Sequence, residues 1–186
     1  MIDAGDIVLI TGIMAAGKST VAQALAERLP RSVHLRGDLF RRMIVNGRTD
    51  VTPENWSAAE TQLHLRYQLA TSAALAYAWA GFAVVYQDVI LGTELTRVVN
   101  LLGSAPGRLF VVVLVPSPDV TAERDRTRHK SGYRDWTPHD LDRGLREETP
   151  RIGLWLDTST QTPDETVDAL VDRFEAAVVR SPYSSS

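Results

Sequence analysis

The segment 12–20 has the residue types and spacing of a phosphate-binding loop. It reads Gly-Ile-Met-Ala-Ala-Gly-Lys-Ser-Thr and fits the pattern G-x-x-x-x-G-K-[ST]. A β-branched run precedes it and an amphipathic stretch follows it, so it stands where a strand-to-helix turn is expected. Its glycines let the backbone turn so that N–H groups point toward bound phosphates. The residues expected to contact a nucleotide are Gly12, Ile13, Met14, Ala15, Ala16, Gly17, Lys18, Ser19 and Thr20.

Two side chains of this loop are expected to act on the phosphates directly. The Lys18 ammonium would reach the β- and γ-phosphate oxygens, where it would help catalysis, and the Ser19 hydroxyl would be a ligand of Mg²⁺. The loop therefore predicts ATP and Mg²⁺ as cofactors.

Two aspartates follow strand-like runs and could supply the carboxylates of a phosphoryl transfer. Ligands of open α/β sheets bind beyond the carboxyl ends of the strands. Asp38, after the strand-like run Ser32–Arg36, suits a catalytic base that contacts the acceptor hydroxyl. Asp88, after the strand-like run Phe82–Tyr86, suits a place near the metal or the acceptor. Asp38 could instead be the N-cap of a helix from Leu39, and Asp88 could be a turn residue.

An arginine-rich stretch, Arg124 to Trp136, resembles a lid that closes over a nucleotide. Arg124 and Arg128 are four residues apart and share a helix face, and Arg134 follows beyond a glycine that can serve as a hinge. Arginines from a closing lid stabilise the charge that spreads over a transferring phosphoryl group. We assign that catalytic role to Arg128 and Arg134, and contact with the adenine base to Arg124. A solvated basic face is the alternative interpretation.

The stretch between the second and third strands is expected to form the wall of an acceptor pocket. It contains a short helix from Leu39 and a long helical stretch up to Ala80. Polar and aromatic side chains of these helices are candidates for acceptor contact, although most aromatics of this kind belong to a core. The candidates are Arg41, Arg42, Trp56, His64, Arg66 and Tyr67, together with Asp38 and Asp88.

Strand-like and helix-like segments alternate five times along the chain. This alternation predicts an α/β domain of three layers, with a five-stranded parallel sheet and helices on both faces. A single domain is expected over residues 1–180, followed by a disordered tail at 181–186. The expected strands are Ile7–Thr11, Ser32–Arg36, Phe82–Tyr86, Leu109–Val115 and Ile152–Leu156. The main expected helices are Ser19–Leu29, Glu94–Leu102, Pro118–Arg128, Pro138–Glu148 and Pro163–Val179.

Composition excludes several other classes of function. The formal net charge of -3 gives no reason to expect a nucleic-acid partner. The chain has no cysteine, which excludes disulfides, thiol catalysis and thiolate metal sites. No apolar run is long enough to span a bilayer, and the amino terminus lacks the pattern of a secretory signal. We therefore expect a cytoplasmic enzyme, as a monomer or small homo-oligomer, with no membrane partner.

The order of these motifs resembles that of the chloramphenicol phosphotransferase-like proteins, which group with small kinases of the zeta-toxin, gluconate and shikimate types. The resemblance rests on 12–20, Gly37-Asp38, the segment 85–92 (Val-Tyr-Gln-Asp-Val-Ile-Leu-Gly) and the stretch 122–128. It spans roughly residues 6–179. It implies a P-loop NTPase fold of strand order 2-3-1-4-5, ATP and magnesium, a hydroxylated acceptor, and Asp38 as the base.

Three functions are consistent with the sequence. The leading hypothesis is a kinase that transfers the γ-phosphate of ATP to a hydroxyl of a small molecule, such as an antibiotic or a sugar-like metabolite. A second is a nucleoside, nucleotide or polynucleotide 5′-hydroxyl kinase. A third is a nucleotide-dependent switch or toxin-like regulator, although a carboxylate beside an arginine lid favours transfer over switching.

Overall fold

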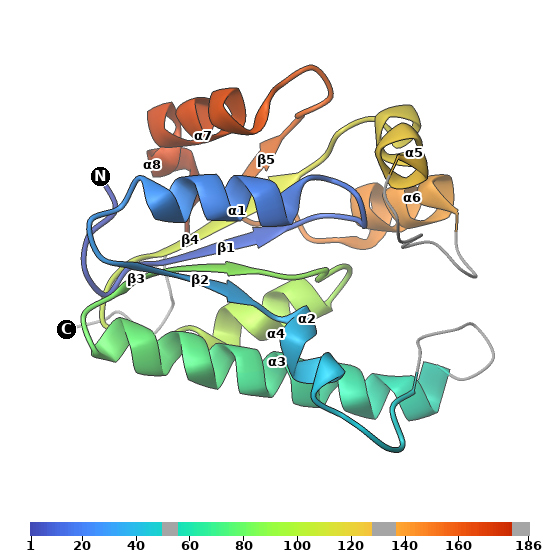
Figure 1. Ribbon diagram of the computed structural model, residues 1–186, viewed down its shortest axis with the longest axis horizontal. Coiled ribbons are helices and arrows are strands. Elements are labelled where there is room, and N and C mark those ends of the chain that lie inside the picture. The colour runs from blue at the N-terminus through green and yellow to red at the C-terminus, as the bar shows by residue number, and fades with distance from the viewer. Residues whose placement is uncertain (50–55, 128–136, 180–186) are drawn as a thin grey trace.

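The computed structural model describes residues 1–49, 56–127 and 137–179. Its centre is a sheet of order β2-β3-β1-β4-β5 in which these five strands run parallel (Figure 1). The predicted three-layer fold and strand order are therefore confirmed. The strands are β1 (Ile7–Thr11), β2 (Ser32–Arg36), β3 (Ala83–Gln87), β4 (Leu109–Leu114) and β5 (Leu154–Leu156).

Helices cover both faces of this sheet (Figure 1). Helices α1, α7 and α8 lie on one face, α3 and α4 lie on the other, and α5 and α6 stand beyond the carboxyl ends of the strands. The helices are α1 (Lys18–Glu27), α2 (Asp38–Arg42), α3 (Trp56–Trp79), α4 (Glu94–Leu101), α5 (Pro118–Arg126), α6 (Pro138–Glu148), α7 (Pro163–Asp172) and α8 (Phe174–Ala177).

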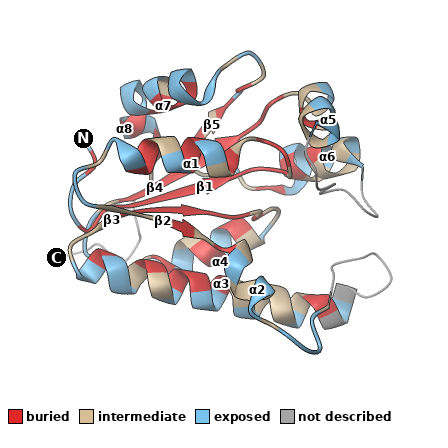
Figure 2. Cartoon of the chain, in the orientation of Figure 1, coloured by how far each residue is buried: buried red, intermediate tan, exposed pale blue. Residues whose placement is uncertain are grey.

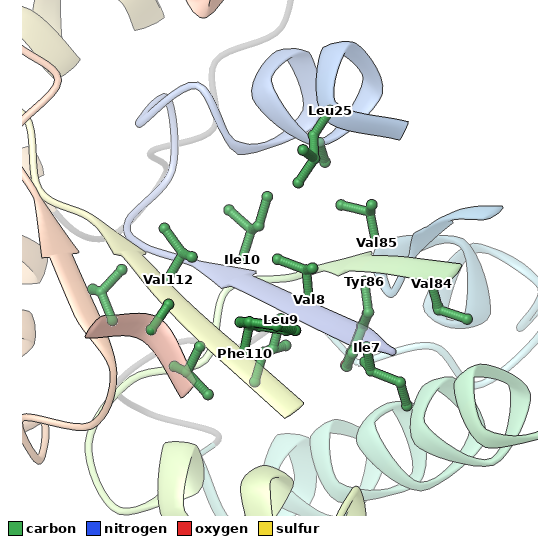
Figure 3. Close-up of a cluster of buried hydrophobic side chains, with 14 of the residues drawn as sticks. Ile7, Val8, Leu9, Ile10, Leu25, Val84, Val85, Tyr86, Phe110 and Val112 are labelled. Atoms are coloured by element: carbon green, nitrogen blue, oxygen red, sulfur yellow. The ribbon is translucent and has the colours of Figure 1, made fainter. Parts of the chain in front are cut away.

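The central strands form the core because every one of their side chains is buried. All five residues of β1 and all six of β4 are buried, as expected for parallel strands covered on both faces. Val8 and Ile10 point toward Leu25 of α1, whereas Ile7 and Tyr86 point toward the opposite face (Figure 3). This rigid centre fixes the positions of the loops at its edge.

Local sequence explains where several helices begin. Helices α5, α6 and α7 each start with a proline that follows a hydroxyl residue. Thr137 and Thr162 form capping boxes with Asp140 and Glu165, so that each pair satisfies two N–H groups of the first turn. These starts agree with the prediction, because the signals are local.

The prediction of one helix over Pro163–Val179 is wrong. The helix α7 ends at Asp172, and a short α8 leads into β6 (Val178–Val179), which pairs antiparallel with β4. Phe174 of α8 is buried against Phe110, with ring centroids 5.3 Å apart. Burial of this ring and the pairing of two β-branched residues outweigh continuation of the helix.

The fifth strand is shorter than predicted. It begins at Leu154 rather than Ile152, because Gly153 has a φ of 71° and its backbone approaches β4 closely. A Cβ at this position would lie 2.2 Å from the carbonyl oxygen of Val111. Only glycine meets both conditions.

Part of the predicted lid, with Arg128 and Arg134, lies outside the described residues, as does the predicted tail at 181–186. Among the helices of the described ranges, none is long and apolar enough to cross a membrane.

Candidate active site

The loop after β1 has the geometry of a phosphate cradle. Gly12 and Gly17 have φ values of 142° and 96°, and Ala15 has a φ of 60°. A Cβ on Gly12 would lie 2.5 Å from the carbonyl oxygen of Leu114 in β4, so this position requires glycine. The loop ends at Gly17, the N-cap of α1, where the first-turn N–H groups and the helix dipole favour an anion.

Lys18 is held inside this loop. Its side chain is buried, and its Nζ donates hydrogen bonds to the carbonyl oxygens of Gly12 and Ile13, at 2.9 and 2.7 Å. An ammonium needs acceptors when it is buried, and these carbonyls supply them. The cation therefore already lies at the position where phosphate oxygens would be bound.

Asp38 is the first residue of α2, and Gly37 is its N-cap. The N-cap interpretation of Asp38 is therefore wrong: the N-cap is Gly37, and no side-chain hydrogen bond caps α2 within the part of the chain that the structure describes. Its carboxylate instead contacts Arg42 at 2.6 Å, and Oδ1 lies 3.8 Å from Nε of Arg36. Among the described residues, this buried Oδ1 has no hydrogen-bond partner. The Asp38 carboxylate therefore keeps hydrogen-bonding capacity that no described group uses.

A glycine brings the two predicted carboxylates together. A Cβ on Gly37 would lie 2.0 Å from Oδ2 of Asp88, so the backbone before Asp38 packs directly on the Asp88 carboxylate. The N–H of Gly37 donates to the carbonyl of Gln87 at 3.0 Å, which continues the strand pairing to this point. The two aspartates therefore meet where β2 and β3 end.

Asp88 is buried and its carboxylate is already partnered. Its Oδ1 accepts from the N–H of Val89 at 2.8 Å, and its Oδ2 lies 3.1 Å from Nε of Arg66. Burial raises the pKa of the Asp88 carboxyl, although the charge of Arg66, the Val89 N–H and the charge of Lys18 act in the opposite direction. The N–H of Asp88 donates to the carbonyl of Ile10 at 3.2 Å, so Asp88 lies beside the end of β1, where the phosphate loop begins.

The donor set fits a magnesium ion that takes most of its ligands from phosphates and water. Within the described ranges, no three His, Asp or Glu side chains gather to hold a metal ion by themselves. Mg²⁺ at nucleotide sites needs only one or two protein oxygens besides phosphates. Ser19 would supply the direct ligand, and Asp88 is placed to act through water.

Arg124 lies against the phosphate loop and borders a cavity. Its Nη2 donates to the carbonyl of Thr158 at 3.0 Å, and its Nη1 lies 3.8 Å from the place of a Cβ on Gly17. The cavity has a volume of about 250 Å³, which can hold a nucleotide base. It is lined by Ala16, Gly17, Thr20, Val21, Arg124, Thr127, Thr158, Gln161, Pro163 and Thr166.

A larger cavity of about 560 Å³ adjoins the first. It runs from Ser19 and Thr20 along α1 to Arg36 of β2. His34 borders it, and burial, followed by the charge of Arg36, lowers the pKa of the His34 imidazole. His34 Nδ1 is paired with Oε1 of Gln23 at 2.7 Å.

The residues predicted to contact an acceptor are only partly brought together. Arg42 pairs with Asp38, and Arg41 lies on the same short helix. His64 instead packs on α4, where its Nε2 lies 3.2 Å from a carboxylate oxygen of Glu94. Trp56 begins α3, but its side chain lies outside the part of the chain that the structure describes.

Sequence reasoning missed Arg36 as a site residue, and also Thr158 and Gln161 beside Arg124. The signal was available in part, because Arg36 ends β2 and Thr158 follows β5 by two residues. Both therefore lie at the same edge of the sheet as the phosphate loop. The hydroxyl-rich stretch after β5 carries no motif, so only its position could have revealed it.

Comparison with known proteins agrees with this architecture. A family model described as an AAA domain matches residues 7–150. A UPF0200 protein of Aeropyrum pernix is 28% identical over 135 residues, which cover 73% of this chain and 71% of the relative.

Solved structures of small kinases and a resistance protein share the fold. The tunicamycin resistance protein of Deinococcus radiodurans has a TM-score of 0.68 at 17% identity, over 94% of this chain and 98% of the other. The APS kinase CysC of Mycobacterium tuberculosis, in complex with AMPPNP and APS, has a TM-score of 0.67 at 19% identity, over 92% and 98%. The architecture is thus that of P-loop kinases.

Proposed function

The chain belongs to the AAA domain family that its residues 7–150 match, and we propose that it is an ATP-dependent kinase acting on a hydroxyl of a small molecule. One observation carries this proposal: Asp38, whose Oδ1 has no hydrogen-bond partner among the described residues, lies at the same sheet edge as Lys18 and the phosphate loop. A regulatory switch has no need of an acceptor for a hydroxyl proton at this place.

The proposed reaction divides the work among a few side chains. The loop amides and Lys18 would bind the β- and γ-phosphates, and bound Mg²⁺ would neutralise part of their charge. Asp38 would orient the acceptor hydroxyl and take its proton late, as a new O–P bond forms and the bond from phosphorus to ADP breaks. Asp88 would hold metal-bound water, and Arg124 would contact the base.

The resemblance and the lining of one cavity support two acceptor classes. The chloramphenicol phosphotransferase-like motifs and the tunicamycin resistance protein of the same fold support antibiotics as candidates. The cavity beside Arg36 is lined by Gln23, Glu27 and His34, which suits a polyhydroxylated, sugar-like group. Both classes belong in a screen for ATP-dependent gain of one phosphate, measured by mass spectrometry.

Asp38→Asn tests the proposed base. The variant keeps the size of the side chain but cannot accept the proton, so ATP affinity should stay within a few-fold of wild type. Transfer to the acceptor should fall by about 10²-fold or more. The matched control is Asp172→Asn, which changes an exposed carboxylate on α7 and should leave both quantities unchanged. Wild-type transfer by a folded Asp38→Asn protein that binds ATP would refute the role of Asp38.

A further inference from the structure

The outer face of α3 is exposed but carries no charge. Between positions 61 and 80 the sequence has one charged residue, Arg66, and its side chain is only 13% exposed because it turns toward Asp88. Exposed residues nevertheless recur along the whole helix (Figure 2). Apart from Tyr77, those from position 61 onward lie mostly three or four residues apart and form one stripe: Thr61, Leu65, Gln68, Leu69, Ser72, Ala76, Trp79 and Ala80.

This stripe differs from the outer face of an ordinary surface helix. Such helices place charged residues opposite their buried face, whereas a helix that is apolar on all sides is normally buried on all sides. Leu65, Leu69 and Trp79 are 44%, 43% and 68% exposed. The described chain leaves over two fifths of each leucine and most of Trp79 open to solvent, so the sequence pattern indicates further burial against another molecule.

We propose that α3 packs against α3 of a second copy of this chain, antiparallel, about a two-fold axis near Ser72. The stripe is uncharged, so it fits a partner that is also uncharged and offers no attraction to a charged one. A second copy presents such a face, and a two-fold interface requires a surface that is complementary to itself.

The order of large and small residues meets that requirement. With the axis between Ser72 and Ala73, Leu65 faces Ala80 of the other copy and Leu69 faces Ala76 of the other copy. Each leucine is therefore opposite an alanine, which allows the close packing of a large side chain over a small one. Small residues at the axis let the two helix backbones approach.

The size of the face sets the expected strength. A helix of 24 residues is about 36 Å long. A face about 10 Å wide then offers roughly half of the ~800 Å² per partner that a standard interface buries. We expect a weak, reversible dimer, because this face is smaller than a standard interface.

Cysteine cross-linking tests both the dimer and its geometry, because the natural chain contains no cysteine. Two copies of Ser72→Cys would meet at the axis, within the ~4–7 Å between Cα atoms that a disulfide allows. Thr61→Cys lies on the same stripe but eleven residues away, so its two copies would be about 33 Å apart. Mild oxidation should therefore link Ser72→Cys and leave Thr61→Cys unlinked.

Sedimentation of the unmodified chain at increasing concentration gives the independent measurement. Leu69→Glu should shift the chain to monomer in sedimentation, and it should abolish disulfide linking when it is combined with Ser72→Cys. The matched control Val171→Glu, at a 47% exposed position on α7, should leave the dimer intact. Circular dichroism and thermal unfolding confirm that each variant is folded.

Three outcomes would overturn the proposal. A chain that stays monomeric up to about 1 mM would mean that a different molecule covers the face. A dimer that survives Leu69→Glu would use another surface. Linking of Thr61→Cys as fast as Ser72→Cys would exclude the antiparallel two-fold arrangement.

Discussion

At each end of the sheet a buried aspartate packs against a glycine. At the amino end, a Cβ on Gly107 would lie 2.5 Å from Oδ1 of Asp6. At the carboxyl end, a Cβ on Gly37 would lie 2.0 Å from Oδ2 of Asp88. Both aspartates are at most 4% exposed. The same device therefore brings a carboxylate against backbone at the two ends.

The two ends differ in how completely their charges are satisfied. Asp6 Oδ1 accepts from the N–H of Arg108 at 2.7 Å, and Oδ2 accepts from Arg108 Nη2 at 2.8 Å and from the N–H of Asp3 at 2.9 Å. At the carboxyl end, within the described residues, Oδ1 of Asp38 and Nε of Arg36 are buried without a hydrogen bond.

This difference distinguishes charged groups that stabilise the fold from charged groups that can still bind a ligand. A fully hydrogen-bonded carboxylate stabilises the fold and has no group left for chemistry. A buried carboxylate oxygen without a donor costs stability, and such costs are typical of sites where a substrate supplies the missing partner. Changes at the carboxyl end should therefore affect activity first, and changes at the amino end should affect stability.

The largest expected effect is that of Lys18→Ala. Removal of the cation from the phosphate loop should lower phosphoryl transfer by about 10³-fold or more, because the transition-state charge loses its main protein counterion. The thermal midpoint should change little, since water can reach the carbonyls of Gly12 and Ile13 once the Lys18 side chain is gone. Kinase assay and thermal unfolding of the same preparation provide the check. Full activity in the folded variant would remove the phosphate loop from the mechanism.

Two matched glycine changes give the next largest effect. Gly37→Ala and Gly107→Ala each place a methyl group on a buried carboxylate, at a cost of about 1–3 kcal/mol. In Gly37→Ala, displacement of Asp88 and Asp38 should lower transfer by about 10-fold to 100-fold. In Gly107→Ala, the thermal midpoint should fall by several degrees with transfer unchanged when assayed well below it. Equal losses of activity in both variants would show that the two ends do not differ in role.

The sequence alone was enough to predict the phosphate loop and the positions of Asp38 and Asp88, because these depend on local motifs at strand ends. It could not show that Gly37 packs on Asp88, since that contact joins neighbouring strands that are distant in sequence. The pairing of Val178 with Phe110 was missed for the same reason. The partners of His64 depend on how α3 packs on α4, which no pattern within either helix encodes.

The smallest effect should appear only as a dependence of stability on pH. Burial raises the pKa of the Asp88 carboxyl above its ordinary value of 3.8, so the folded protein holds that proton more tightly than the unfolded chain does. The free energy of unfolding must then fall as pH rises from the unfolded value through the folded one. Asp88→Asn removes the titration but keeps Arg66 in place. Relative to this variant, wild type should therefore lose stability as pH is raised above the ordinary carboxyl pKa of 3.8. Urea unfolding across this range, with Asp172→Asn as the exposed control, measures the difference. A difference that stays flat or grows with pH would mean that Arg66 and the Val89 N–H compensate the burial of Asp88 completely.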